Sequence, residues 1–179
     1  SLRYVIFGGE ALNPAKIKSW KEEFPACRLV NMYGITETTV HVTYQEIGDE
    51  HLESSKSVIG KAIPTLTIFI LDNAQHLVPI GIEGELCIGG AGLARGYLNQ
   101  PGLTADKFIA HPFVEGERLY RSGDLGRWLA DGNIEYLGRK DDQVKIRGHR
   151  IEIGEIEYAL EQHEQIKQAV VLAIENQSG

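Results

Sequence analysis

The chain has 179 residues and a formal net charge of −7, and its hydrophobic and charged fractions are 42% and 24%. These fractions are ordinary for a soluble globular protein, whereas the acidic balance argues against a nucleic-acid partner, which would require a basic surface. No apolar run is long enough to span a bilayer and no signal peptide opens the chain, so we expect a cytoplasmic protein without a membrane partner. Cys27 and Cys87 are single and far apart, which favours two reduced thiols over a disulfide framework or a zinc site.

The first segment, residues 1–45, predicts an α/β layer. The apolar run RYVIFGG predicts a strand that ends in a tight turn at two glycines. The pair Asn13-Pro14 supplies an N-cap and a first helical residue for a helix over residues 15–24, and residues 27–33 predict a second strand. Ligands bind beyond the carboxyl ends of the strands in such sheets, and the motif of residues 30–44 begins at one of these ends.

The middle segment, residues 46–140, has a different sequence pattern, in which short strand-forming runs are separated by Gly, Pro and Asn-Gly turns. This pattern is typical of a small antiparallel sheet or barrel, and we expect a β-barrel region here. The runs that predict its strands are TLTIFILD, GELCIGG, ERLYRSGDLGRWL and GNIEYLGR.

The last segment, residues 141–179, predicts the start of a small α+β subdomain. An amphipathic helix is expected over residues 153–163, and residues 168–174 predict a final strand. Asp141 and Asp142 interrupt a group of basic residues, which favours a solvated hinge or interface over a nucleic-acid surface. These basic residues are Arg139, Lys140, Lys145, Arg147, His149 and Arg150.

The stretch VNMYGITETTVHVTY, residues 30–44, combines side chains that suit a nucleotide and a metal ion. Thr36 and Thr38 offer hydroxyl donors to a phosphate, and Glu37 offers a carboxylate to a hard cation such as Mg²⁺. Tyr33 offers a flat face to a base, and Asn31 offers a donor and an acceptor to the edge of that base. A polar, threonine-rich surface loop is the alternative interpretation of the same residues.

Two further motifs lie in the middle segment. Asp124, in the turn of YRSGDLGRW, offers a carboxylate that can accept hydrogen bonds from both hydroxyls of a ribose. A turn aspartate without a ligand is the commoner explanation of such a residue on its own. The run GGAGLARG has the wrong glycine spacing for a dinucleotide fingerprint, and no helical pattern follows it.

Taken together, four motifs give the chain a resemblance to a known family. NMYGITETTV, GELCIGGAGLARGYL, YRSGDL and GRKDDQVKIRGHRIEIGEIE stand in the order and spacing of the adenylation domains of nonribosomal peptide synthetases (NRPS), which belong to the adenylate-forming enzymes. The resemblance covers essentially the whole chain. It implies a partial adenylate-forming fold, with the end of the large N-terminal subdomain and the start of the small C-terminal one. It also implies a ligase of antibiotic or other secondary-metabolite biosynthesis that converts an amino acid and ATP into aminoacyl-AMP.

The resemblance also assigns roles to individual residues. Thr36 and Glu37 would bind the α-phosphate and Mg²⁺, Lys145 would be a basic residue of the active site, and Asp141 would be the hinge of the small subdomain. Ile35 stands where many members have proline, which should alter the stiffness of the loop more than its chemistry. The positions that would contact ATP are Gly8, Gly9, Glu10, Asn31, Tyr33, Gly34, Thr36, Asp124, Tyr136 and Arg139.

The same resemblance places five positions of the amino-acid pocket in this chain, namely Ile6, Gly8, Met32, Val40 and His41. This set is similar to that of threonine-activating members. His41 can hydrogen-bond a β-hydroxyl, while Val40 and Met32 can bound a small methyl group. The alternative is a core histidine that is hydrogen-bonded to the backbone.

Two parts that the family carries are absent from the sequence, a phosphate-binding loop upstream and a C-terminal lysine that contacts the adenylate. Both ends therefore resemble cuts in something longer, and we expect the segment alone to be inactive. The whole protein would transfer the acyl group to the phosphopantetheine thiol of a peptidyl carrier protein, next to neighbouring synthetase domains. The alternatives are an acyl- or aryl-CoA synthetase of the same superfamily and a non-catalytic nucleotide-binding module.

Overall fold

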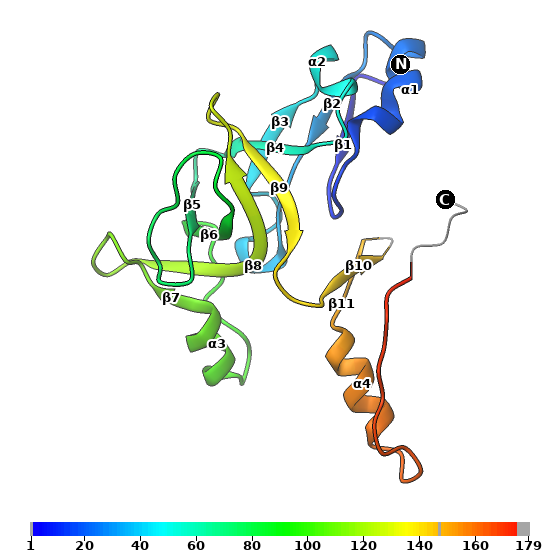
Figure 1. The fold of residues 1–179 in the computed structure, drawn as a ribbon. Coiled ribbons are helices and arrows are strands. Elements are labelled where there is room, and N and C mark those ends of the chain that lie inside the picture. The colour runs from blue at the N-terminus through cyan, green and yellow to red at the C-terminus, as the bar shows by residue number, and fades with distance from the viewer. Residues whose placement is uncertain (1, 147, 175–179) are drawn as a thin grey trace. The chain divides into compact units, whose positions relative to one another are not determined.

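The fold is that of a computed structural model, which describes residues 2–146 and 148–174. The chain divides into two compact units, residues 1–140 and residues 141–179. Figure 1 shows the strands of the first unit and the hairpin and helix of the second. No helix in the described part of the chain is long and apolar enough to cross a membrane.

The first unit begins with the predicted strand, helix and strand. Two parallel strands, in which Tyr4 lies opposite Arg28, flank a short helical segment. The side chain of Asn13 accepts a hydrogen bond from the backbone N–H of Ala15 at 3.1 Å, and Pro14 follows this cap as the first helical residue. The α/β layer predicted from the sequence is therefore present. Its elements are β1 (Tyr4–Phe7), η1 (Pro14–Ile17), α1 (Lys18–Glu23) and β2 (Arg28–Asn31).

The same sheet continues through the rest of the unit. It has nine strands in the order β1-β2-β3-β4-β9-β8-β6-β5, with β7 paired to β8. All pairs other than β1 with β2 are antiparallel. The added strands are β3 (Thr43–Glu46), β4 (Ser57–Ala62), β5 (Leu66–Leu71), β6 (Gly84–Gly90), β7 (Phe108–Ala110), β8 (Arg118–Trp128) and β9 (Ile134–Arg139). The short helices between them are η2 (Thr36–Thr38), α2 (Asp49–Leu52) and α3 (Pro101–Lys107).

The predicted β-barrel is wrong. β5 and β1 stand at opposite ends of the strand order, so the described strands form an open mixed sheet. Alternation and turn spacing are the same in open and closed antiparallel sheets, because closure depends on strand tilt and stagger. β3 (Thr43–Glu46) also spans the boundary that was expected between residues 45 and 46, so the sheet is continuous across this boundary. The division of the chain into three segments stays a prediction.

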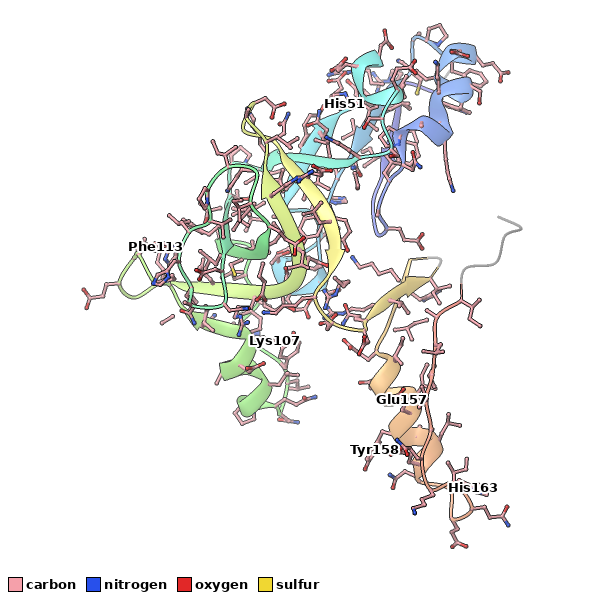
Figure 2. The ribbon with its side chains drawn as sticks, viewed as in Figure 1. His51, Lys107, Phe113, Glu157, Tyr158 and His163 are labelled. Atoms are coloured by element: carbon pink, nitrogen blue, oxygen red, sulfur yellow. The ribbon has the colours of Figure 1, made fainter. Side chains whose placement is uncertain are left out.

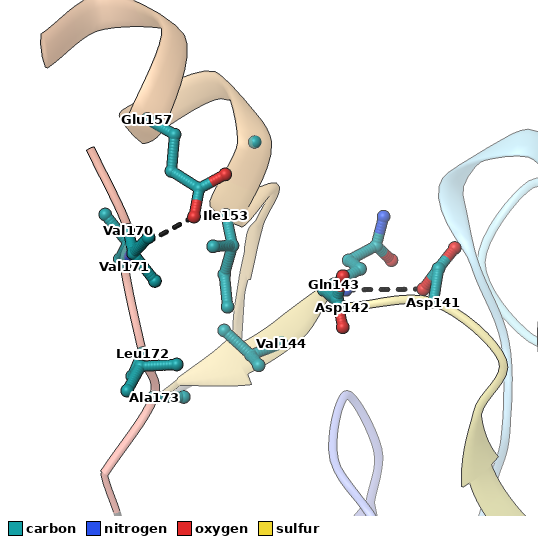
Figure 3. A pocket seen from close by; sticks show the side chains of 11 residues that line it. Asp141, Asp142, Gln143, Val144, Ile153, Glu157, Val170, Val171, Leu172 and Ala173 are labelled. Atoms are coloured by element: carbon teal, nitrogen blue, oxygen red, sulfur yellow. Dashed lines mark hydrogen bonds between the residues drawn. The ribbon is translucent and has the colours of Figure 1, made fainter. Parts of the chain in front are cut away.

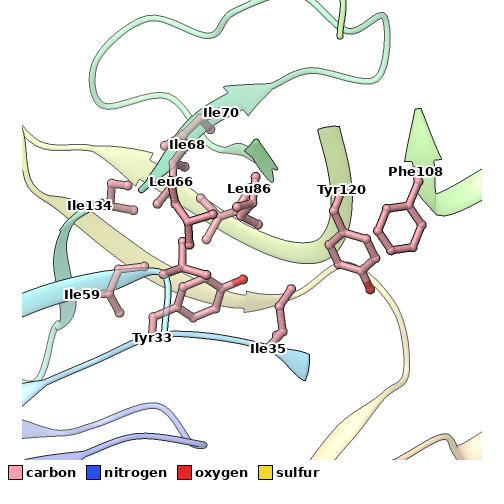
Figure 4. Packing of buried hydrophobic residues seen from close by; sticks show 12 residues of the cluster. Tyr33, Ile35, Ile59, Leu66, Ile68, Ile70, Leu86, Phe108, Tyr120 and Ile134 are labelled. Carbon is pink, nitrogen blue, oxygen red and sulfur yellow. The ribbon is translucent and has the colours of Figure 1, made fainter. Parts of the chain in front are cut away.

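The main core of the first unit includes part of the predicted nucleotide loop. Tyr33 and Ile35 pack with buried side chains from the sheet, as Figure 4 shows. The other members of this cluster are Val42, Ile59, Leu66, Ile68, Ile70, Leu86, Ile88, Phe108, Tyr120 and Ile134. A second cluster, centred on Leu29, packs the helical segment η1–α1 against β1 and β2 through Ile17 and Trp20.

The second unit consists of a hairpin, a helix and an extended segment. β10 (Val144–Ile146) and β11 (His149–Ile151) pair antiparallel, and α4 (Ile153–Glu161) follows. The helix predicted over residues 153–163 is thus present, and its Tyr158 is 67% exposed (Figure 2).

The strand predicted over residues 168–174 is wrong. In this segment the N–H groups of Ala169 and Val171 donate to the carboxylates of Glu161 and Glu157 on α4, at 3.1 and 2.9 Å. The apolar run finds no strand partner among the described residues of the unit, so side chains of the helix bond its backbone instead.

Candidate functional site

The loop that follows β2 folds back tightly on itself. The N–H groups of Val42 and Thr43 both donate to the carbonyl of Tyr33, at 2.7 and 3.1 Å. A Cβ on Gly34 would lie 1.8 Å from the carbonyl oxygen of Val40, so only glycine fits at this crossing. Thr39 has a φ of +82°, a conformation that costs a non-glycine residue free energy and needs surrounding contacts to persist. The loop is therefore a fixed turn and not a loose surface segment.

Asp124 on β8 lies at the centre of a buried polar network. Its side chain is fully buried; Oδ2 accepts a hydrogen bond from the Tyr33 hydroxyl at 2.6 Å, and Oδ1 accepts from Arg139 Nη1 at 3.1 Å and from the Tyr136 hydroxyl at 3.3 Å. Burial is the main cause that raises the pKa of Tyr33 well above its usual range, so this hydroxyl stays protonated and donates to Asp124. The network joins the loop after β2 to β8 and β9.

This burial bears on the predicted ribose contact of Asp124. A carboxylate offers about four acceptor positions, and Tyr33, Tyr136 and Arg139 take three of them. Two ribose hydroxyls would therefore bind at Asp124 only if one or more of these donors gave way. The ribose contact stays a prediction.

Glu37 is the second buried carboxylate of the region. Its Oε1 accepts a hydrogen bond from the Tyr97 hydroxyl at 2.7 Å, and this hydroxyl lies 3.2 Å from that of Tyr120. Burial is the main cause that raises the pKa of Tyr97, so its hydroxyl is a donor at neutral pH. The sequence interpretation missed Tyr97, although it stands in the quoted motif GELCIGGAGLARGYL.

The surroundings of Glu37 fit one kind of Mg²⁺ site, in which the protein supplies a single carboxylate. No group of three or more His, Cys, Asp or Glu side chains that suits a metal ion occurs among residues 2–146 and 148–174. Mg²⁺ in nucleotide sites is commonly held by one or two carboxylates together with phosphate oxygens. Glu37 therefore fits as the protein ligand of a Mg²⁺ ion whose other ligands include phosphate oxygens.

The threonines of the loop have different surroundings. Thr36 is exposed at the start of η2, which suits a contact with a phosphate. Thr38 is fully buried and its hydroxyl donates to the carbonyl of Ile35 at 3.1 Å. The expectation that Thr38 offers its hydroxyl to a phosphate is therefore wrong, because local backbone bonding uses this donor.

The expected base contacts lie at the carboxyl ends of β1 and β2. Asn31 is 3% exposed, and its Nδ2 donates to the carbonyl of Val58 on β4 at 2.8 Å. The turn of Gly8, Gly9 and Glu10 is exposed directly after β1. The backbone of this turn is thus open to a ligand, whereas the Asn31 amide already ties β2 to β4.

Three of the five positions expected in the amino-acid pocket lie together. A Cβ on Gly8 would lie 3.2 Å from the Met32 carbonyl oxygen and 3.7 Å from His41 Cε1. Ile6 and Val40 are each 59% exposed. The imidazole of His41 is half-buried and has no hydrogen bond in the described part of the chain, which argues against a core histidine bonded to the backbone.

The second unit holds the other predicted site residues. Lys145 is half-buried on β10, and Asp141 accepts a hydrogen bond from the Gln143 N–H at 3.3 Å. A cavity of about 460 Å³ in this unit is lined by apolar residues of β10, α4 and residues 170–173 and by the carboxylates of Asp141, Asp142 and Glu157 (Figure 3). Three carboxylates do not suit the phosphates of a nucleotide. Arg147, a member of the predicted basic group, lies outside the described residues.

The sequence profile described as AMP-binding enzyme matches residues 1–98, more than half of the chain. The chain belongs to the AMP-binding enzyme family. It is 54% identical, over an alignment of 184 residues, to a dimodular nonribosomal peptide synthase of Bacillus subtilis (strain 168), covering all of this chain and 8% of that protein. It is 51% identical over 178 residues to gramicidin S synthase 2 of Brevibacillus brevis, covering 99% of this chain and 4% of that protein.

The fold is also similar to that of solved structures. PA1221, described as an NRPS protein containing adenylation and PCP domains, has a TM-score of 0.89 at 32% identity, over 98% of this chain and 36% of that one. This member of the AMP-binding family is thus part of an NRPS adenylation domain. The chain spans only a small part of the length of its relatives.

Proposed function

We propose that the protein containing this chain is an ATP-dependent ligase that activates an amino acid as its adenylate. The substrate carboxylate attacks the α-phosphorus of ATP, the bond between this phosphorus and the α–β bridging oxygen breaks, and pyrophosphate leaves. A phosphopantetheine thiol on a peptidyl carrier protein then attacks the acyl carbon, a thioester forms and AMP leaves. The observation that supports this proposal best is the rigid turn after β2, which carries Tyr33, Thr36 and Glu37 in a chain of the AMP-binding family.

Each residue of the site has a proposed task. The Thr36 hydroxyl donates to the α-phosphate, and the Glu37 carboxylate holds Mg²⁺, which supplies positive charge to the phosphates. Asp124 and Arg139 bind and orient the ribose, and Tyr33 lies against the base. The remaining proposed contacts to the nucleotide come from Gly8, Gly9, Glu10, Asn31, Gly34 and Tyr136, while Lys145 acts in the active site and Asp141 is the hinge.

We further propose threonine as the substrate. Gly8, Met32 and His41 lie close together, and an imidazole without a hydrogen bond in the described part of the chain suits a β-hydroxyl. Ile6 and Val40 complete the part of the pocket that this chain supplies. Valine has the same shape but leaves the imidazole unpaired, and sites built for a hydroxyl discriminate strongly against analogues that lack it.

Pyrophosphate exchange by the complete protein tests both proposals. The panel holds threonine, serine and valine together with fatty and aryl acids. We expect the highest rate with threonine and a rate at least about tenfold lower with valine. Glu37→Gln should lower exchange at normal Mg²⁺ concentrations, whereas the matched control Glu83→Gln, at an exposed position away from the turn, should not.

Other results would select the alternatives. Exchange with fatty or aryl acids and transfer to coenzyme A would indicate an acyl- or aryl-CoA synthetase. No exchange with any acid would indicate a non-catalytic nucleotide-binding module. Exchange with another amino acid would keep the ligase and reject threonine.

A further inference from the structure

Tyr97 reaches the Glu37 carboxylate from a distant part of the sequence. It lies 60 residues after Glu37, and its hydroxyl donates to Oε1 at 2.7 Å. Its own backbone N–H donates to the hydroxyl of Thr104 on α3 at 2.9 Å, and its ring packs edge-on against Phe108 with centroids 5.7 Å apart. The tyrosine is therefore held at its backbone and at its ring, and its hydroxyl has a fixed position.

The turn that carries Glu37 has other attachments to the loop before Tyr97. The N–H of Ala94 donates to the carbonyl of Glu37 at 2.8 Å, and the hydroxyl of Thr39 donates to the carbonyl of Gly92 at 2.9 Å. Both bonds hold the backbone of the turn and neither touches the carboxylate. The Tyr97 hydroxyl, in contrast, contacts the carboxylate itself, and its loss should leave these two backbone attachments of the turn in place.

We propose that Tyr97 is a positioning residue that fixes the Glu37 carboxylate for the divalent cation. The inference rests on the proposed function, in which Glu37 is a ligand of Mg²⁺. A carboxylate can rotate about its last side-chain bond, whose torsional preference is broad. A hydrogen bond from a rigid donor to Oε1 restricts this rotation. Partners that orient metal ligands in this way typically contribute 10- to 100-fold to metal affinity.

The test is Tyr97→Phe in the complete protein, because phenylalanine keeps the ring and removes only the hydroxyl. Mn²⁺ serves as a probe, and its binding in the presence of ATP without amino acid is measured by electron paramagnetic resonance of the free ion. We expect roughly tenfold weaker Mn²⁺ binding. The Mg²⁺ concentration for half-maximal pyrophosphate exchange should rise in parallel, with little change in the rate at saturating Mg²⁺.

Tyr120→Phe is the matched control. It removes a buried hydroxyl that lies 3.2 Å from the Tyr97 hydroxyl, and it leaves the Tyr97 hydroxyl in place to donate to Glu37. We therefore expect a much smaller change in Mn²⁺ binding for this variant. Equal losses for the two variants would overturn the inference, because they would indicate a general effect of hydroxyl removal on packing.

Glu37→Gln separates failure of the inference from failure of the proposed function. If Glu37→Gln loses Mn²⁺ affinity and Tyr97→Phe binds like the unmodified protein, Tyr97 does not position the carboxylate and the metal role of Glu37 stands. If Glu37→Gln also binds Mn²⁺ normally, the metal role of Glu37 is wrong and the inference falls with it. Thermal unfolding of each variant shows whether the change in metal binding occurs in a folded protein.

Discussion

The two units of the chain differ in how much of their apolar surface they bury. In residues 2–140, a cluster of buried side chains from most of the strands surrounds Tyr33 and Ile35 of the nucleotide loop. In the described residues after Lys140, Gln143 is the one buried residue, and apolar side chains of α4 and of residues 166–174 are exposed. Tyr33 of the predicted site is thus part of a core, whereas Lys145 has no comparable support within the described part of its own unit.

The two units also differ in the buried polar groups that they hold. Asp124 and Glu37 in the first unit each accept hydrogen bonds from rigid donors. In the second unit, the Nε2 of Gln143 bonds to Glu152, while its Oε1 is buried without a partner among the described residues. The first unit also holds one such atom, Ser57 Oγ, so the difference lies in the buried carboxylates: the described part of the second unit has none.

Asp124→Asn should have the largest effect on the stability of the first unit. It removes the charge that pairs with Arg139 in a fully buried position, and loss of one partner of a buried pair destabilises a protein by about 3 kcal/mol or more. Urea denaturation measures this loss, and calorimetry of the complete protein should show at least about tenfold weaker ATP binding. The control Asp142→Asn, at an exposed position of the second unit, should change stability by less than about 0.5 kcal/mol. Similar stability of both variants would show that the Asp124 network contributes little.

Truncation of one isoleucine in each unit measures how much buried apolar side chains stabilise that unit. Ile134→Ala removes a fully buried side chain of the main core and should destabilise this chain by about 2–5 kcal/mol. Ile156 on α4 is 40% exposed, so Ile156→Ala should have an effect well below that. Unfolding of both variants in denaturant checks the difference. A large effect of Ile156→Ala in the complete protein alone would show that this face of α4 is covered there.

The smallest expected effect concerns the boundary between the units, at Asp141. Asp141→Pro fixes φ and removes an N–H at this position. If Asp141 is the hinge, adenylate formation in the complete protein should stay near normal, while transfer to the carrier thiol falls by about tenfold or more. Pyrophosphate exchange and carrier loading are measured separately. Equal losses in both, or no loss in either, would reject Asp141 as a hinge that alternates the two reactions.

Local patterns predicted the parts of the fold that local interactions determine. The Asn13-Pro14 cap and the apolar runs around it predicted β1, the helical segment and β2, and the spacing of apolar residues predicted α4. Sheet closure and the strand at residues 168–174 were mispredicted, because both depend on partners that the pattern of one segment does not specify. The open order of the sheet was therefore found only in the structure.

The candidate site shows the same limit. Residue types pointed to Glu37 and Asp124, but their partners Tyr97 and Tyr33 lie 60 and 91 residues away and meet them through the folding of the sheet. The inward orientation of Thr38 was also missed, since three threonines in one loop offer the same chemistry until the backbone assigns their donors.

These long-range pairs set rules for chimaeras in which part of this chain is exchanged with a relative. A crossover between residues 37 and 97 takes Glu37 from one parent and its hydroxyl partner from the other, and it also divides Tyr33 from Asp124. A crossover directly after Lys140 divides neither pair, because both lie within the first unit. Recombination at that point therefore inherits both buried carboxylates together with their donors from one parent.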